Sequence, residues 1–243
     1  MTVTWEERGW ERLGAGVGRI RLPGWDCTAG LIVGEGAALL IDAGSSPAEG
    51  ARLRADAEAL AGGRVTHLAL THPHFDHVFG AAAFAGAELF GAAGVEAALS
   101  GRPAREELRA DAVRHGLPAA EAAEAADALA VPRHQVTGER TLDLGGGHRV
   151  LLAAVGPGHT AHDLAVLVPG GPALVFCGDL VEESGPPQAG PDAVPSRWPA
   201  ALDRLLSLGG EDALYVPGHG AVVGAGFVRE QRDALARRFG VEG

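Results

Sequence analysis

Short apolar runs bounded by glycine or proline alternate with amphipathic stretches along the chain, a pattern typical of buried strands connected by helices and turns. In the first third, two apolar runs are joined by Gly34-Glu35-Gly36, which suits a tight hairpin between antiparallel strands. Further on, Ser46-Pro47-Ala48-Glu49 is a capping box with proline in the first turn, and it predicts the start of a helix. The predicted strands are 29–33, 37–41, 64–70, 87–90, 150–154, 163–168, 173–177 and 213–216. The predicted helices are 47–62, 77–84, 92–99, 103–115, 118–130, 196–208 and 226–239.

Both halves of the chain offer strands that can form a hairpin sheet, followed by covering helices. The most economical packing places two sheets face to face with helices on their outer faces. We therefore expect an α+β fold, a four-layer αββα sandwich, formed by a single domain over residues 1–243. Residues 92–130 are rich in Ala, Glu and Arg and interrupt the strand-rich pattern, so we interpret them as a helical insertion in that domain.

Composition and charge narrow the functional classes. Of the 243 residues, 47% are hydrophobic and 21% are charged, and no apolar run reaches the ~20 residues that a membrane span needs. The net charge of −11 repels phosphate backbones and anionic lipid, so we expect no nucleic-acid and no membrane partner. Glu6, Glu7 and Arg8 stand where a secretory signal would have its apolar core, which predicts a cytoplasmic location.

The basic residues and the cysteines exclude further chemistries. The chain contains no lysine, which excludes Schiff-base catalysis and phosphate binding by a P-loop lysine. Cys27 and Cys177 are far apart in the sequence and form no CxxC motif. We expect them to be buried, reduced thiols rather than members of a cysteine-based zinc site.

Three histidines and an aspartate are crowded into six residues, His72-Pro73-His74-Phe75-Asp76-His77, at the end of a predicted strand. Imidazole and carboxylate are the usual ligands of zinc, manganese and iron. In an extended loop His72 and His74 point to the same side and can share one ion, whereas Asp76 and His77 point elsewhere. The spacing therefore suggests two adjacent ions.

Three further segments combine a strand end with a glycine- or proline-rich turn and one metal-binding side chain. They contain His159, Asp179 and His219, each next to a glycine that lets the backbone approach closely. If the four segments converge on one edge of the sandwich, they complete a metal site. The isolated histidines are instead expected to be surface or capping residues; they are His67, His115, His134 and His148.

Taken together, these motifs resemble the metallo-β-lactamase superfamily of metallo-hydrolases. The resemblance extends from the predicted hairpin, where Ile41-Asp42-Ala43-Gly44 matches the superfamily's Asp-x-Gly, to His219. It implies an αββα sandwich with a two-metal site at one edge. By motif, the first ion would be held by His72, His74 and His159, the second by Asp76, His77 and His219, with Asp179 bridging both.

The aspartate at position 179 resembles the glyoxalase II-like branch of the superfamily, which acts on thioesters, esters and lactones. β-Lactamases of the superfamily generally have Cys or Ser at this place. RNA-processing relatives carry an additional large domain for which this chain has no room. Flavodiiron relatives have Glu where His74 stands and a fused flavin domain.

The resemblance implies a metal-dependent hydrolase, in which a hydroxide held between two divalent ions attacks a small acyl substrate: a thioester, an ester or a lactone. Zinc is the expected ion, with iron or manganese as alternatives. Asp76 is a candidate for orienting the hydroxide or moving its proton, and His162 for protonating the leaving group. Asp42, Thr71 and Thr160 are candidates for orienting the ligands.

Two other functions stay open at this stage. One is a mononuclear iron dioxygenase of the persulfide type, and the other is a non-catalytic metal-binding sensor on the same fold. The partner is expected to be a small molecule, and the oligomeric state is open, with a homodimer as one option. Residues 92–130 and the proline-rich residues 182–198 adjoin ligand loops and are expected to border the substrate.

Overall fold

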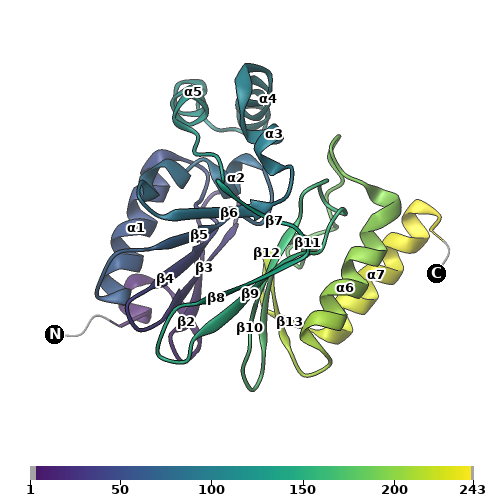
Figure 1. Cartoon of the computed structure of the whole chain (residues 1–243). Helices are drawn as coiled ribbons and strands as arrows, with labels where there is room; N and C mark the ends of the chain where they lie inside the picture. The colour runs from purple at the N-terminus through teal and green to yellow at the C-terminus, as the bar shows by residue number, and fades with distance from the viewer. Residues whose placement is uncertain (1–3, 242–243) are drawn as a thin grey trace.

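A computed structural model describes residues 4–241 of the chain. It contains two sheets that pack face to face, with helices on both outer faces (Figure 1). Helix α1 (Pro47–Ala61) covers one sheet, and α6 (Trp198–Gly209) and α7 (Ala225–Phe239) cover the other. This mixed α+β architecture confirms the predicted αββα sandwich.

The first sheet has seven strands in the spatial order β1-β2-β3-β4-β5-β6-β7. Neighbouring strands are antiparallel from β1 to β4 and parallel from β4 to β7. The strands are β1 (Glu11–Gly14), β2 (Val17–Arg21), β3 (Thr28–Val33), β4 (Ala38–Ile41), β5 (His67–Ala69), β6 (Glu88–Ala92) and β7 (His134–Val136).

The second sheet has six strands in the order β13-β12-β11-β10-β9-β8. Only β11 and β12 are parallel neighbours, and the other pairs of this sheet are antiparallel. The strands are β8 (Glu139–Asp143), β9 (Arg149–Ala154), β10 (Leu164–Val168), β11 (Leu174–Glu182), β12 (Leu214–His219) and β13 (Val223–Gly224).

The remaining helices lie mostly at one end of the sandwich (Figure 1), and all but α4 and α5 are short. Helices α3, α4 and α5 form the helical block expected near residues 92–130, and it stands above the edge of the first sheet (Figure 1). The α-helices are α2 (Phe75–Val78), α3 (Val95–Leu99), α4 (Gly101–Arg114) and α5 (Ala119–Ala128), and the 3-10 helices are η1 (Glu6–Arg8), η2 (Ala81–Phe84) and η3 (Pro195–Arg197).

Three apolar layers hold the sandwich together. In β3 the adjacent side chains of Leu31 and Ile32 point to opposite faces, so Leu31 packs towards α1 and Ile32 packs between the sheets. A third layer, which includes Trp198 and Tyr215, lies between the second sheet and helices α6 and α7. A strand buried on both faces has a continuous apolar run, which is why residues 29–33 were recognisable as a strand.

The predicted continuous helix at 77–84 is wrong. The structure has two short helices there, α2 and η2, on either side of Gly80. A β-carbon at Gly80 would lie 2.0 Å from the carbonyl oxygen of Ala43, so this backbone packs tightly against the segment that follows β4. This close contact interrupts the helix at Gly80, and the helical periodicity of the sequence does not show the interruption.

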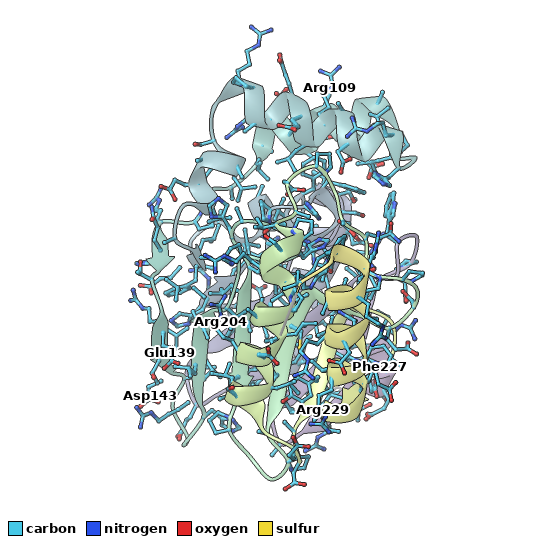
Figure 2. The ribbon with its side chains drawn as sticks, turned by 90° about the vertical axis from the view of Figure 1, so that its right-hand side faces the viewer. Arg109, Glu139, Asp143, Arg204, Phe227 and Arg229 are labelled. Atoms are coloured by element: carbon cyan, nitrogen blue, oxygen red, sulfur yellow. The ribbon has the colours of Figure 1, made fainter. Side chains whose placement is uncertain are left out.

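Five strands were missed because their side chains carry little apolar signal. Strand β8 is the clearest case, since only Leu142 of its five residues is buried. Figure 2 shows Glu139 and Asp143 of this strand at the edge of the molecule. The other missed strands are β1, β2, β7 and β13. Conversely, β11 is longer than predicted and runs to Glu182, with all nine residues buried.

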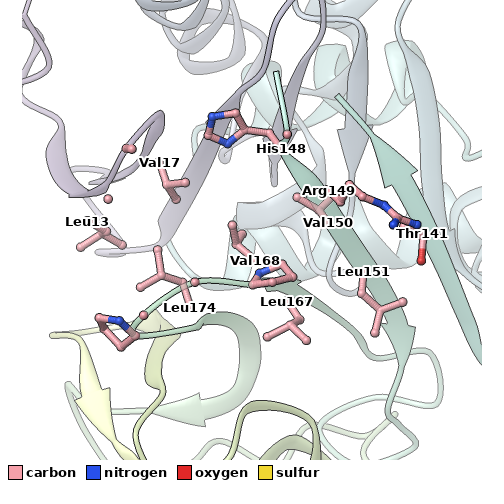
Figure 3. A pocket seen from close by; sticks show the side chains of 17 residues that line it. Leu13, Val17, Thr141, His148, Arg149, Val150, Leu151, Leu167, Val168 and Leu174 are labelled. Atoms are coloured by element: carbon pink, nitrogen blue, oxygen red, sulfur yellow. The ribbon is translucent and has the colours of Figure 1, made fainter. Parts of the chain in front are cut away.

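One end of the sandwich carries a cavity of about 800 Å³ between β1–β2 and the turn at 169–172 (Figure 3). Val17, Val150 and Leu174 contribute apolar side chains to it, and His148 lines its rim. The turn leads into the beginning of β11. This cavity is therefore at the end opposite the carboxyl ends of the parallel strands, where the predicted ligands lie.

Candidate metal centre

Seven histidine and aspartate side chains meet at the carboxyl ends of the central strands. They are His72 and His74 after β5, Asp76 and His77 in α2, His159 between β9 and β10, Asp179 within β11, and His219 at the end of β12. The structure therefore brings the four predicted segments together. Asp179 belongs to a strand rather than to a loop, because β11 continues past it.

The side chains form two groups that could each hold a metal ion. Ligand atoms lie within 4.8 Å of one another in the first group, His72, His74, His159 and Asp179, and in the second group, Asp76, His77 and His219. Bonds to zinc are about 2.0–2.2 Å long, so two atoms on one ion lie at most about 4.4 Å apart, and shifts of a few tenths of an ångström would bring each group within reach of a central ion. Both groups therefore match the donor sets of divalent transition metals in number and in chemistry.

The carboxylate of Asp179 contacts both groups. Its Oδ1 lies 3.2 Å from Nε2 of His77, and its Oδ2 lies 3.2 Å from Nε2 of His219. On the other side, Oδ2 is 3.6 Å from Nε2 of His72 and 3.5 Å from Nε2 of His159. Of the two carboxylates in the cluster, Asp179 is thus the one with short contacts to histidines of both groups.

Asp42 and Thr71 orient two of the histidines from behind. Oδ2 of Asp42 lies 2.9 Å from Nδ1 of His77 and accepts a hydrogen bond from the Thr71 hydroxyl at 2.7 Å. The Thr71 hydroxyl oxygen is in turn 3.0 Å from Nδ1 of His72. With Nδ1 engaged in this way, Nε2 of each ring is left to face the cluster.

The other three histidines are oriented by groups that are far away in the sequence. In each case the ring nitrogen that faces away from the cluster has an oxygen partner. These contacts are His159 Nδ1 to the Gln188 carbonyl at 3.1 Å, His219 Nδ1 to the Trp25 carbonyl at 2.8 Å, and His74 Nε2 to Oδ2 of Asp192 at 3.0 Å. His74 therefore presents Nδ1 to the cluster, 3.0 Å from Nε2 of His159.

Three buried polar atoms at the centre of the cluster lack a hydrogen-bond partner within residues 4–241. They are Nε2 of His72, Nε2 of His77 and Oδ1 of Asp179. A buried polar atom without a partner costs about 1–3 kcal/mol, so such atoms require an explanation. A metal ion explains them, because it would bind the lone pairs that point inward. The residues present therefore fit a metal.

The protonation behaviour of the cluster agrees with this interpretation. Burial lowers the pKa of His72 well below its usual value and that of His159 to about 4, so both rings are neutral and able to bind a metal. Burial also acts on His77 and His219, but the nearby carboxylates, above all Asp179 and Asp76, together outweigh it and raise their pKa values, that of His219 to about 11. The raised pKa values mean that His77 and His219 hold protons next to Asp179, where a divalent cation would lie when bound.

Two glycines next to ligand candidates, Gly158 and Gly218, allow neighbouring groups to pack closely against the backbone. A β-carbon at Gly218 would lie 1.8 Å from Oδ1 of Asp179, so no larger residue fits there without moving this carboxylate. At Gly158, next to His159, a β-carbon would lie 2.6 Å from Cδ2 of Leu180. Both glycines are required by close packing rather than by unusual dihedral angles.

The turn that carries His159 is closed by Asp163. Its Oδ1 accepts hydrogen bonds from the backbone N–H of Thr160 at 2.9 Å and from the Thr160 hydroxyl at 2.7 Å. Burial raises the pKa of Asp163 to about 7. Thr160 thus supports the His159 turn through Asp163.

His162 lies apart from the cluster. Its Nδ1 is 3.0 Å from the carbonyl oxygen of Ala93, and it is absent from the described residues that line the cavity beside the ligands. Its role as a proton donor stays a prediction.

That cavity has a volume of about 820 Å³, and five ligand candidates form part of its lining. Segments from the helical block and from the loop after β11 surround it. Residues 92–130 and 182–198, which were expected to border the substrate, supply most of this lining, whereas Trp25 was missed. His115 caps α4, as expected, and also lines the cavity. Trp25 and Gln188 orient histidines through backbone carbonyls, which leave no signal in the side-chain pattern.

The fold and the clustered side chains define an αββα protein with a candidate metal centre. The chain belongs to the metallo-beta-lactamase superfamily, whose profile matches residues 22–219. Cys27 and Cys177 are buried and unpaired, as expected. Within the described part of the chain, every helix is too short or too polar to cross a membrane.

Solved structures of metallo-β-lactamases share the fold. FIM-1 from Pseudomonas aeruginosa, in its mono-zinc form, has a TM-score of 0.70 and 19% sequence identity, covering 96% of both chains. The enzyme from Pontibacter korlensis also has a TM-score of 0.70 and 19% identity, covering 93% of this chain and 97% of its own. The enzyme from Hirschia baltica has a TM-score of 0.65 and 17% identity, covering 93% of this chain and 96% of its own. No curated protein sequence matches this chain.

Proposed function

We propose that this protein is a two-metal hydrolase of small acyl compounds of the thioester, ester or lactone type. The observation that carries the proposal is the position of Asp179, whose two carboxylate oxygens contact histidines of both ligand groups. A carboxylate shared in this way suits two adjacent cations. The cavity of about 820 Å³ beside them offers space for a small substrate.

Zinc is the proposed ion at both positions, with iron and manganese as alternatives. The first position would be held by His72, His74 and His159, the second by Asp76, His77 and His219, with Asp179 shared between them. When bound, such a pair supplies an activated water at neutral pH and polarises the acyl carbonyl. The orienting contacts from Asp42, Thr71, Gln188, Trp25 and Asp192 keep the inward-facing nitrogens fixed.

Asp76 has a proposed second role in proton transfer. Its Oδ2 lies 3.4 Å from Nε2 of His219 and 3.7 Å from Nε2 of His77, and the residue lines the cavity. From this position its carboxylate can orient the attacking water and accept a proton from it. His162 remains a proposed proton donor to the leaving group, and the loop that carries it would have to move towards the cavity for this.

The glyoxalase II-like branch is the proposed place within the superfamily. The support is the aspartate at position 179, which resembles that branch. The structural neighbours described above are β-lactamases, but at 17–19% identity their likeness extends to the fold alone. The buried, unpaired thiols agree with a reducing compartment, so we propose a cytoplasmic location.

Elemental analysis of the purified protein, combined with a screen of thioester, lactone, phosphodiester and β-lactam substrates, tests this function. We expect two metal ions per chain and turnover of thioesters or lactones. The Asp179→Ala variant should lose metal and turnover together, whereas Asp233→Ala, on the surface of α7, should keep both. One iron per chain with oxygen consumption would indicate a dioxygenase, and bound metal without turnover of any substrate would indicate a sensor.

A further inference from the structure

The walls of the cavity beside the ligands differ in character from its base. The base is formed by ligand candidates, including His74, Asp76 and Asp179. The walls are formed by the segment around Trp25, by helices α3 and α4, and by the loop after β11. A substrate would place its reacting carbonyl at the base, and the rest of the molecule would contact these walls.

One wall is apolar and firmly packed. Trp25 contacts Phe75 edge to face, with ring centroids 5.3 Å apart, and its Nε1 donates a hydrogen bond to the carbonyl oxygen of His115 at 3.3 Å. Phe75 stacks on the ring of His115 at 5.8 Å. Leu108 and Ala104 of α4 extend this surface. The helical block thus supplies an apolar contact surface for an acyl chain.

The charged groups on the walls are predominantly acidic. Glu107 and Asp111 belong to α4, and Glu182 and Asp192 belong to β11 and the loop that follows it. Among the described residues that line the cavity, Arg114 is the only arginine, and its Nη2 donates to Oδ1 of Asp111 at 2.7 Å. Because the chain contains no lysine, no ammonium side chain is available either.

Other arginines of the helical block are engaged elsewhere. Arg102 pairs with Glu106 on the surface of α4. Arg105 donates to three backbone carbonyls at the end of α5. Arg109 is exposed and points away from the sheets at the top of the molecule (Figure 2). A carboxylate, phosphate or sulfonate that lies against these walls, away from the metal ions proposed at the base, would therefore have no free cationic side chain as a partner.

We propose that the cavity accepts substrates in which an apolar acyl group is joined to an uncharged or cationic leaving group, and that it discriminates against anionic substrates. This inference rests on the proposed hydrolase function. An anionic leaving group held against the walls, with the acyl carbonyl at the metal ions, would lose part of its hydration and gain no ion pair with a side chain in return. Like charges on the walls add repulsion, which is a common source of specificity.

A series of S-octanoyl thioesters tests the proposal on the zinc-loaded full-length protein. The leaving thiols are N-acetylcysteamine, which is neutral, thiocholine, which is cationic, and 3-mercaptopropionate, which is anionic. We expect kcat/KM for the anionic thioester to be lower than for the other two by about tenfold or more.

The length of the acyl chain is tested separately. The kcat/KM of the S-acetyl ester of N-acetylcysteamine should be about tenfold or more below that of its S-octanoyl counterpart. Equal or better turnover of the anionic thioester, or equal turnover of the short one, would overturn the proposal.

Two neighbouring glutamates of α4 give a matched pair of variants. Glu107 lines the cavity, whereas Glu106 pairs with Arg102 outside it. Glu107→Arg should raise kcat/KM for the anionic thioester relative to the neutral one by about threefold or more, and Glu106→Arg should leave this ratio unchanged. An unchanged ratio in Glu107→Arg would contradict the role of the acidic wall.

A binding measurement separates this inference from the proposed function. If no thioester is hydrolysed, the hydrolase proposal fails, but the cavity can still be probed by calorimetry on the zinc-loaded protein. The ratio of the affinities for hexyltrimethylammonium and hexanesulfonate should then fall in Glu107→Arg and stay unchanged in Glu106→Arg, because the zinc ions contribute equally in all three proteins. An unchanged ratio in Glu107→Arg would overturn the inference.

Discussion

Oδ2 of Asp42 lies 2.9 Å from Nδ1 of His77 and 2.7 Å from the hydroxyl of Thr71, so one carboxylate supports histidines of both ligand groups. Asp42 has a φ angle of 58°, in the left-handed region that few residues other than glycine adopt. Aspartate and asparagine tolerate this region better than other side chains do. The backbone conformation directs the carboxylate behind the cluster.

Replacing Asp42 with Asn should weaken metal binding by about 10–100-fold while the fold is retained. The amide keeps the left-handed backbone but removes the charge, and it offers only one acceptor oxygen in place of two. Titration against a competing chelator measures the affinity. Asp26→Asn is the matched control, because Asp26 also has a positive φ, 62°, and pairs with Arg21 outside the cluster. Equal affinities in the two variants would contradict the orienting role of Asp42.

A methyl group at Gly218 should disable the metal centre. In Gly218→Ala the new β-carbon would lie 1.8 Å from Oδ1 of Asp179 and must displace that carboxylate. We expect the metal content to fall below one ion per chain, measured by elemental analysis, with an unchanged circular dichroism spectrum. Gly226→Ala, in α7 with open space around the glycine, should keep its metal and gain about 0.4–1 kcal/mol of stability. Full metal occupancy in Gly218→Ala would show that Asp179 is dispensable.

Asp192 should strengthen metal binding by the first ligand group, because it orients His74. Its carboxylate is the oxygen partner of His74 Nε2, at 3.0 Å, and its side chain is 46% exposed. We expect Asp192→Asn to weaken one of the two metal-binding steps by about tenfold. This is the lower end of the range of about 10–100-fold for orienting contacts, because solvent can partly replace the lost contact. Visible spectra during cobalt titration separate the two steps. A loss from both steps, or from neither, would contradict this assignment, and Asp233→Asn serves as the surface control.

The pH dependence of stability should report on Asp163. Burial raises its pKa from 3.8 to about 7 in the folded state, so between about pH 4 and pH 7 the folded chain binds a proton that the unfolded chain has released. The free energy of unfolding therefore falls as the pH rises through this window, by up to about 1.4 kcal/mol per pH unit, and the loss is complete above pH 7.

Asp163→Asn has no such proton to lose. Urea unfolding of the metal-free protein should show the variant gaining stability relative to the wild type as the pH rises from 4 to 7. Asp143→Asn, on the exposed edge strand β8, is the control for the same change of side chain at the surface. A difference between Asp163→Asn and the wild type that is independent of pH would contradict the raised pKa.

The sequence was sufficient to predict the parts of this protein that depend on local patterns. The cluster from His72 to His77 is contiguous, and strands β3 and β4 are apolar throughout because both faces are buried. Asp42 was also expected to support a ligand, since it ends a strand. Each of these features follows from residue type and spacing within a few positions.

Features that depend on distant backbone could not be predicted in this way. The carbonyl oxygen of Trp25 contacts His219, 194 positions away, and any residue type would offer the same group. The break of the helix at Gly80 follows from contact with Ala43, which belongs to another segment. Strand β8 is exposed on most of its residues and carries little apolar pattern. The tertiary structure decides these features.

Each ligand group draws side chains from both sheets. His72 and His74 follow a strand of the first sheet, whereas His159 and Asp179 belong to the second, and the other group is divided in the same way. A cation in either group would therefore cross-link the two halves of the sandwich. Free metal at a thousand times its dissociation constant adds about 4 kcal/mol to the free energy of unfolding. The stability of the folded protein would then rise with the supply of metal.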